Sequence, residues 1–264
     1  MRFVFASLGL SLAILGVLGI HPGNSPRLLI AEATSGRQAP GGEFAPAAAV
    51  QQGSAGAAVT VSSPITAWAD DGIRYVFEGQ EWDGQSVANV DAALLSLPIR
   101  VRGELGNRNL GGLSILVNRS GRTLAGKTPY GSAANFFSTN DGDNQVVLFP
   151  DQSPPTVLHE LGHAYNLRET PPGRYALVLL QPEMQSFMAA TGWRVLSTPE
   201  QVGAARDQTA VAYAYDGGFA WPRISHSDPL EDFANTFALY FSSPDGLQSQ
   251  SPERFAWFEA NVGQ

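Results

Sequence analysis

The chain has 264 residues, of which 44% are hydrophobic and 15% are charged, so it can form a compact core and is not a disordered polymer. Its 16 Lys and Arg residues face 24 Asp and Glu residues, and the formal charge of −8 provides no basic surface for a nucleic-acid backbone. Cysteine is absent, which excludes disulfides and thiol chemistry and restricts any metal site to nitrogen and oxygen ligands.

Residues 1–33 carry an early cation, Arg2, and then an almost unbroken apolar run from Phe3 to Ile20. This order is typical of a secretory signal peptide, and the small residues around Ala31 provide a cleavage site. The run is also near the ~20 residues that span a bilayer, so an uncleaved N-terminal anchor is the alternative. Both interpretations predict a protein that is secreted or associated with the cell envelope.

Residues 34–63 are mostly Ala, Gly, Ser, Gln, Thr and Pro. Such a composition buries too little apolar surface to offset the entropy of ordering, so we expect a low-complexity flexible linker, with a short pro-segment as the alternative. Residues 64–264 then remain for one domain of ordinary size.

The first half of this domain has β character. The patterns predict, in chain order, a hairpin at 65–77 that turns at Asp71-Gly72, a helix at 87–98, a buried strand at 113–118, and two strands, 134–139 and 145–149. The turn between the last two strands contains Asp141 and Asp143, and we interpret it as a hairpin turn rather than a calcium loop.

The second half is helical. Ser153 precedes Pro154 and Pro155, which predicts a helix start with serine capping the first amides, and this helix should continue to Leu167. Further helices are expected at 182–190, 230–241 and 252–260. Together the two halves predict an α+β fold, with a small antiparallel or mixed sheet on the first helix and a mainly helical C-terminal lobe.

The first of these helices contains His159-Glu160-Leu161-Gly162-His163, the HExxH pattern. Residues four apart lie on one helix face, so both imidazoles can reach one ion while Glu160 lies beside them. A match by accident in a chain of this composition has a chance of roughly three in a thousand. We therefore predict one Zn²⁺ bound by His159 and His163, with two buried core histidines as the alternative.

A catalytic zinc site takes a third protein ligand. Glu231 is the preferred candidate, because it flanks the apolar stripe of the helix at 230–241, whereas Asp232 lies nearly opposite that stripe. Glu231 can alternatively serve only to stabilise the positive N-terminus of its helix. A second candidate is Glu169, six residues after His163, in the position of the third ligand of the compact HExxHxxGxxH arrangement.

The segment VLHELGHAYNL resembles the active-site helix of the zincin metallopeptidases, and LEDFANTFALYF resembles the second helix of the Glu-zincin group, which includes anthrax lethal-factor-like and related zinc-binding peptidases. The match covers both motifs and their order, roughly the C-terminal half. This resemblance implies a zincin-like fold and zinc metalloendopeptidase activity on a peptide or protein substrate. Residues 134–137 also resemble the edge strand that holds extended peptides in such enzymes.

Two positions depart from the family pattern. Asn235 stands where members often have an acidic residue, and it can accept a hydrogen bond from a ligand histidine without adding charge. Ile224 stands where lethal-factor-type enzymes have a tyrosine that stabilises the oxyanion. Tyr213, Tyr215 or His226 can substitute for that tyrosine, and His226, five residues before Glu231, is the candidate we assign.

The leading hypothesis is an exported peptidase in which zinc activates a water and Glu160, as general base, takes its proton and passes it to the leaving amine. The alternative is an exported zinc-binding envelope or interaction protein without peptidase activity. A zinc hydrolase of other amides is a third hypothesis. The sequence predicts no oligomeric state and no cleavage specificity.

Overall fold

The computed structural model describes residues 71–106, 112–124, 144–171, 174–205, 210–216 and 228–263, together with the backbone of two strands at 27–29 and 134–138. Apart from residues 27–29, the predicted leader and linker lie outside this part of the chain. No helix in the described ranges is long and apolar enough to span a membrane. The described elements mix helices with two small sheets, which confirms the α+β class.

A four-stranded mixed sheet forms the first half of the domain. Its strand order is β2 (Ile73–Tyr75), β3 (Leu113–Val117), β5 (Asn144–Leu148) and β4 (Ala134–Ser138). The first three strands are parallel, and β4 pairs antiparallel with β5. Every residue of β3 and β5 is buried, as expected for central strands covered on both faces. The predicted buried strand and the predicted β4–β5 pair are thus confirmed.

The hairpin expected at 65–77 has a different outcome. Its first strand lies outside the described residues, and its second strand, β2, pairs in parallel with β3. The Asp71-Gly72 turn packs against the end of α2 (Ile99–Leu105), where Gly72 has φ +80° and its backbone faces Gly106 so closely that a Cβ would clash. The Asp71-Gly72 pair predicts a turn from neighbouring residues alone, so it does not indicate the contact with Gly106.

The helices begin where the sequence places proline. All α-helices from α3 onward have proline in the first turn, where the missing amide breaks no helical hydrogen bond. The helices besides α2 are α1 (Gly84–Ser96), α3 (Pro154–Asn166), α4 (Pro182–Thr191), α5 (Pro199–Ala204), α6 (Pro229–Ser242), α7 (Pro244–Gln250) and α8 (Pro252–Asn261). The helices α1, α3, α4, α6 and α8 match predicted helices, whereas α2, α5 and α7 were not predicted.

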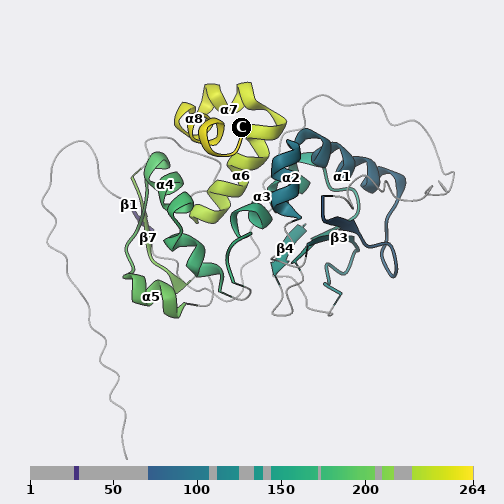
Figure 1. Ribbon diagram of the computed structural model, residues 1–264, viewed down its shortest axis with the longest axis horizontal. Coiled ribbons are helices and arrows are strands. Elements are labelled where there is room, and N and C mark those ends of the chain that lie inside the picture. The colour runs from purple at the N-terminus through teal and green to yellow at the C-terminus, as the bar shows by residue number, and fades with distance from the viewer. Residues whose placement is uncertain are drawn as a thin grey trace, which may run out of the picture.

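A second sheet lies beside α4 and α5 in Figure 1. It contains β1 (Arg27–Leu29), β7 (Tyr213–Tyr215) and β6 (Trp193–Val195), with β7 in the centre and antiparallel to both neighbours. These three-residue strands carry too short a pattern to be predicted. The sheet matters for the site because Trp193 of β6 contacts Asp232 of α6, and Tyr215 of β7 contacts Arg254 of α8.

Helices α3 and α6 lie at the centre of the molecule, between the four-stranded sheet with α1 and α2 and the side formed by α4, α5 and β7 (Figure 1). They pack against each other more extensively than any other two elements, and α3 also contacts β4 and β5. At their crossing, a Cβ on Gly162 would lie 2.9 Å from Ala234 Cα and 3.0 Å from Phe237 Cβ. Glycine at this position therefore permits the close approach of the two helices.

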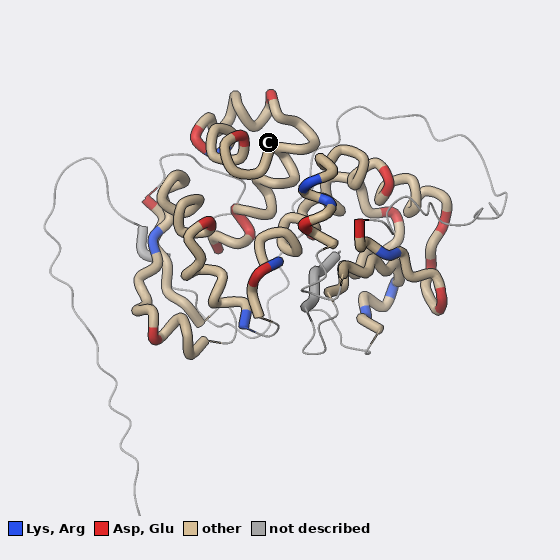
Figure 2. The backbone as a smooth tube through the Cα atoms, in the orientation of Figure 1, with Lys and Arg blue, Asp and Glu red and all other residues tan. Residues whose placement is uncertain are grey.

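Charged residues are spread over all parts of the molecule. Figure 2 shows Lys and Arg positions scattered over the sheet side, the centre and the α4–β7 side, with acidic positions interspersed among them. Several arginines form ion pairs, including Arg102 with Asp71 at 2.8 Å and Arg168 with Glu183 at 2.7 Å. These cations therefore serve the packing of helices in the described structure.

Candidate metal centre

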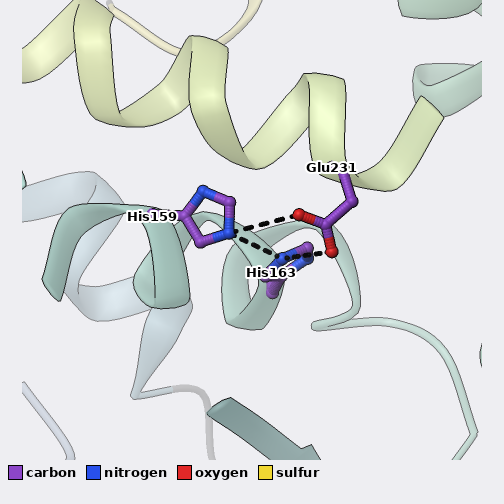
Figure 3. Close-up of side chains that lie close together, drawn as sticks. All are labelled: His159, His163 and Glu231. Atoms are coloured by element: carbon purple, nitrogen blue, oxygen red, sulfur yellow. Dashed lines mark hydrogen bonds and ion pairs between the residues drawn. The ribbon is translucent and has the colours of Figure 1, made fainter. Parts of the chain in front are cut away.

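Helices α3 and α6 bring two imidazoles and one carboxylate together. His159 and His163 project from one face of α3 towards Glu231 in the first turn of α6 (Figure 3). The two Nε2 atoms are 3.2 Å apart, and each lies 3.4 Å from a different oxygen of Glu231. One ligand atom from each residue can be chosen so that all three lie within 4.8 Å of one another.

These separations fit a zinc site. Bonds of about 2.0 Å in a tetrahedral complex place neighbouring ligand atoms about 3.3 Å apart. The separations of 3.2–3.4 Å are close to this value, with each imidazole against a different oxygen of Glu231. The donor set of two imidazole nitrogens and a carboxylate is one that catalytic zinc uses. The side chains remain partly accessible, with exposures of 19% for His159, 15% for His163 and 31% for Glu231. A cation and a further small ligand can therefore reach the group from solvent.

The electrostatics of the cluster are strongly coupled. Burial alone would lower the pKa of His163, but the charge of Glu231 and its hydrogen bond outweigh burial and raise the pKa to about 9. Burial alone would raise the pKa of Glu231, yet His163 and His159 hold that pKa well below its usual range. Without a cation, the carboxylate is thus balanced by a proton on imidazole, and a divalent cation can replace that proton.

Asp228 lies at the start of the same helix. Its carboxylate accepts a hydrogen bond from the Leu230 amide at 2.7 Å and so caps α6. Burial raises the pKa of Asp228 to about 7, although the Leu230 amide opposes this rise. The residue adds negative potential close to His163 and Glu231.

Asn235 orients one of the imidazoles. Its Oδ1 lies 2.9 Å from Nδ1 of His159, one turn after Glu231 on α6. A proton on Nδ1 donates to this oxygen and leaves the lone pair of Nε2 directed towards Glu231, which is the tautomer that a metal ligand requires. The contact expected from the sequence, a neutral amide accepting from a ligand histidine, is present.

Glu160 lies between the two histidines in the sequence of α3. It is buried, with 6% of its surface exposed, and its charge contributes to the raised pKa of His163. The HExxH spacing therefore places a carboxylate next to the cluster formed by His159, His163 and Glu231, in addition to the carboxylate within it.

Of the other candidates, Glu169, Tyr213 and Tyr215 do not join this cluster. Glu169 is exposed beyond the end of α3 and is not part of the group. Tyr213 is buried against the ring of Trp193, and the Tyr215 hydroxyl lies 3.3 Å from Nη2 of Arg254. His226 and Ile224 lie outside the described residues, so the assignment of His226 as oxyanion donor stays a prediction.

Two further expectations need correction. Ser153 is the N-cap of α3, but its hydroxyl lies 3.1 Å from Thr156 Oγ1 and bonds that side chain instead of a helix amide. Asp232 was placed on the polar side of its helix, whereas it is 0% exposed and paired with Arg254. Asp232 is buried because α6 packs against α3 on one face and against α8 and β6 on another. An apolar stripe marks only one of these faces.

Comparison with known proteins adds no relative: no family model and no curated protein matches the chain. The class of site rests on the geometry of the residues themselves.

Proposed function

We propose that this protein is a zinc-dependent metallopeptidase of Glu-zincin type, in which His159, His163 and Glu231 hold one Zn²⁺. The observation that carries the proposal is the convergence of two imidazole nitrogens and a carboxylate at 3.2–3.4 Å around an accessible point, although Glu231 follows His163 by 68 residues in the chain. Sites that hold zinc only for stability are usually closed by four protein ligands, whereas catalytic sites have three and an open position.

In peptide hydrolysis at such a site, Glu160 and Asn235 would have different roles. Zinc bound in this group would supply a Lewis acid and lower the pKa of a coordinated water towards ~7. Glu160 takes the proton of the attacking water and transfers it to the nitrogen of the leaving amine as the peptide bond breaks. Asn235 holds the ring of His159 in register throughout, because its oxygen keeps Nδ1 as the donor.

The sheet supports a peptide as the substrate. Among the described strands, β4 is at the edge of its sheet, is antiparallel to β5, and contacts α3. An edge strand offers unpaired backbone groups to which an extended peptide can add as a further strand. A small sheet next to α3 and a helical lobe that carries Glu231 support the zincin-like plan that the two sequence motifs imply.

The experiment compares Glu160→Gln with Glu169→Gln in the full chain, assayed on a broad peptide library with zinc content measured in parallel. Glu160→Gln should retain zinc and lose cleavage, since the base is removed and the ligands remain. Glu169→Gln should match the unaltered protein in both, since Glu169 is exposed and outside the cluster. Full cleavage by Glu160→Gln would contradict the assigned role. Stoichiometric zinc without any cleavage by the unaltered protein would favour the exported zinc-binding protein instead.

A further inference from the structure

A second face of α6, about 100° round the helix from Glu231, holds a buried network centred on Asp232. Arg254 of α8 binds its carboxylate twice, with Nε 2.9 Å from Oδ1 and Nη2 2.7 Å from Oδ2. Trp193 Nε1 of β6 donates to Oδ2 at 2.7 Å, and Thr236 Oγ1 lies 3.3 Å from Oδ1. Both partners of the ion pair are 1% exposed at the side chain, so solvent does not share these bonds.

Asp232 directly follows Glu231, so the two carboxylates leave the helix about 100° apart. A rigid first turn therefore transmits any rotation at one residue to the other. A helix side chain ends about 5–6 Å from the axis, so a rotation of about 10° displaces the Glu231 carboxylate by about 1 Å. Metal–ligand distances tolerate only about 0.2 Å.

The other contacts of α6 do not define this rotation alone. Gly162 sets how closely α3 and α6 approach, and the aromatic contacts of Phe233 with Phe187, Trp257 and Phe258 are apolar and less directional than hydrogen bonds to a charged group. The bidentate Arg254 fork and the Trp193 bond have fixed directions. They connect α6 to two separate elements, α8 and β6.

We infer that Asp232, through Arg254 and Trp193, is a positioning residue that sets the rotation of α6 and so presents the Glu231 carboxylate to His159 and His163. The inference rests on the proposed zinc site for its affinity readout, but the position of Glu231 can be measured without metal. Asp232, Arg254 and Trp193 would thus act on the site without touching the imidazole nitrogens or the Glu231 carboxylate.

The test replaces the network by apolar residues of similar volume. Removal of one partner of a buried ion pair leaves the other uncompensated and can unfold the chain, so Asp232→Leu is combined with Arg254→Met, an exchange that is often neutral for stability. A second variant, Trp193→Phe, removes one directed hydrogen bond and keeps a smaller aromatic ring. The matched control is Asp71→Leu with Arg102→Met, which deletes a largely buried ion pair between α2 and the turn before β2, remote from α6 in sequence.

Two measurements are made on each folded variant: the zinc dissociation constant by chelator competition, and the Glu231-to-imidazole distances in a metal-free crystal structure. The double variant should bind zinc 10–100-fold more weakly, with Trp193→Phe intermediate and the control unchanged. In the metal-free double variant, the 3.4 Å separations should be lost. Unchanged separations and affinity in a folded double variant would overturn the inference while leaving the zinc site intact. Absence of zinc binding by the unaltered protein would overturn the proposed function, and the distances would then decide the positioning role alone.

Discussion

The two faces of α6 carry neighbouring carboxylates in opposite surroundings. Glu231 is 31% exposed and faces two imidazoles, which are cationic only when protonated. Asp232 is completely buried and faces the permanent cation of Arg254. Asp232, which has a permanent counter-ion, is thus buried, whereas Glu231, which has none, is accessible to solvent. The Asp232 side of the helix is therefore fixed by a buried ion pair, whereas the Glu231 side is accessible to the cation that we propose.

The first way to break the comparison is to neutralise each carboxylate separately. Asp232→Asn should lower the free energy of unfolding by about 3–5 kcal/mol, because it leaves Arg254 buried beside an uncharged amide. Glu231→Gln should have a much smaller effect on the metal-free protein and should abolish tight zinc binding. Chemical denaturation with chelator present, together with zinc titration, measures both effects. Similar stability losses for the two variants would show that Asp232 and Glu231 contribute alike to folding, and would contradict the comparison.

The second prediction concerns the packing that brings the faces into place. Gly162→Ala should destabilise the protein by about 1–3 kcal/mol and weaken zinc binding, because its Cβ would press on Ala234 and Phe237 and force α3 and α6 apart. Gly103→Ala in α2 is the matched control, since a Cβ there meets no atom within 4 Å. The control should be neutral or more stable, because alanine favours helix over glycine by up to about 1 kcal/mol. Equal thermal unfolding of the two variants would show that the helix crossing is not tight.

The third prediction concerns the contact between Asn235 and His159, on the same side of α6 as Glu231. Asn235→Ala should weaken zinc binding 10–100-fold with little change in fold, because His159 loses the acceptor that selects its tautomer. Asn235→Asp restores an acceptor and adds a charge, and it should bind zinc at least as tightly as the unaltered chain. Chelator competition measures both variants. An unchanged affinity in Asn235→Ala would remove Asn235 from the site.

The fourth and smallest effect is a pH dependence. The pKa of His163 is raised to about 9 in the folded metal-free protein from an ordinary value near 6.5, so the folded state holds a proton that the unfolded state has lost between these values. This contribution to stability is complete below about pH 6.5 and declines as pH rises towards 9. Zinc binding requires the deprotonated ring and should become stronger over the same range.

Thermal unfolding from pH 6.5 to 8.5, with chelator and with zinc, checks the sign of both effects. Stability should fall with pH in the metal-free sample, relative to a His163→Asn reference, and the stabilisation added by zinc should grow. A stabilisation by zinc that shrinks as pH rises would contradict the coupling between the proton and the metal.

The sequence predicts the surroundings of Glu231 on α6, but it does not predict those of Asp232. The positions of His159, His163, Glu231 and Asn235 follow from four-residue spacing within two helices, and such spacing is a local property. The burial of Asp232 depends on Arg254 and Trp193, which lie 22 and 39 residues away in the chain. No periodicity reports a partner at that distance, so the helical pattern places Asp232 nearly opposite the apolar stripe and does not predict its burial.

The same contrast holds for the strands. The β4–β5 pair was predictable because neighbours in sequence pair across a short turn. The parallel pairing of β2 with β3 joins segments separated by two helices, α1 and α2, and the pairing of β6 with β7 joins segments separated by α5. Patterns within a window of a few residues do not carry that information.

X-ray absorption at the zinc edge, combined with zinc quantification on the full chain and on Glu231→Gln, tests the central claim most directly. The account predicts one Zn²⁺ per chain with two imidazole nitrogens at about 2.0–2.1 Å and carboxylate oxygen at about 2.0–2.2 Å, and loss of that oxygen signal with weakened binding in the variant. A chain that takes up no stoichiometric zinc, or a coordination sphere that Glu231→Gln leaves unchanged, would contradict it.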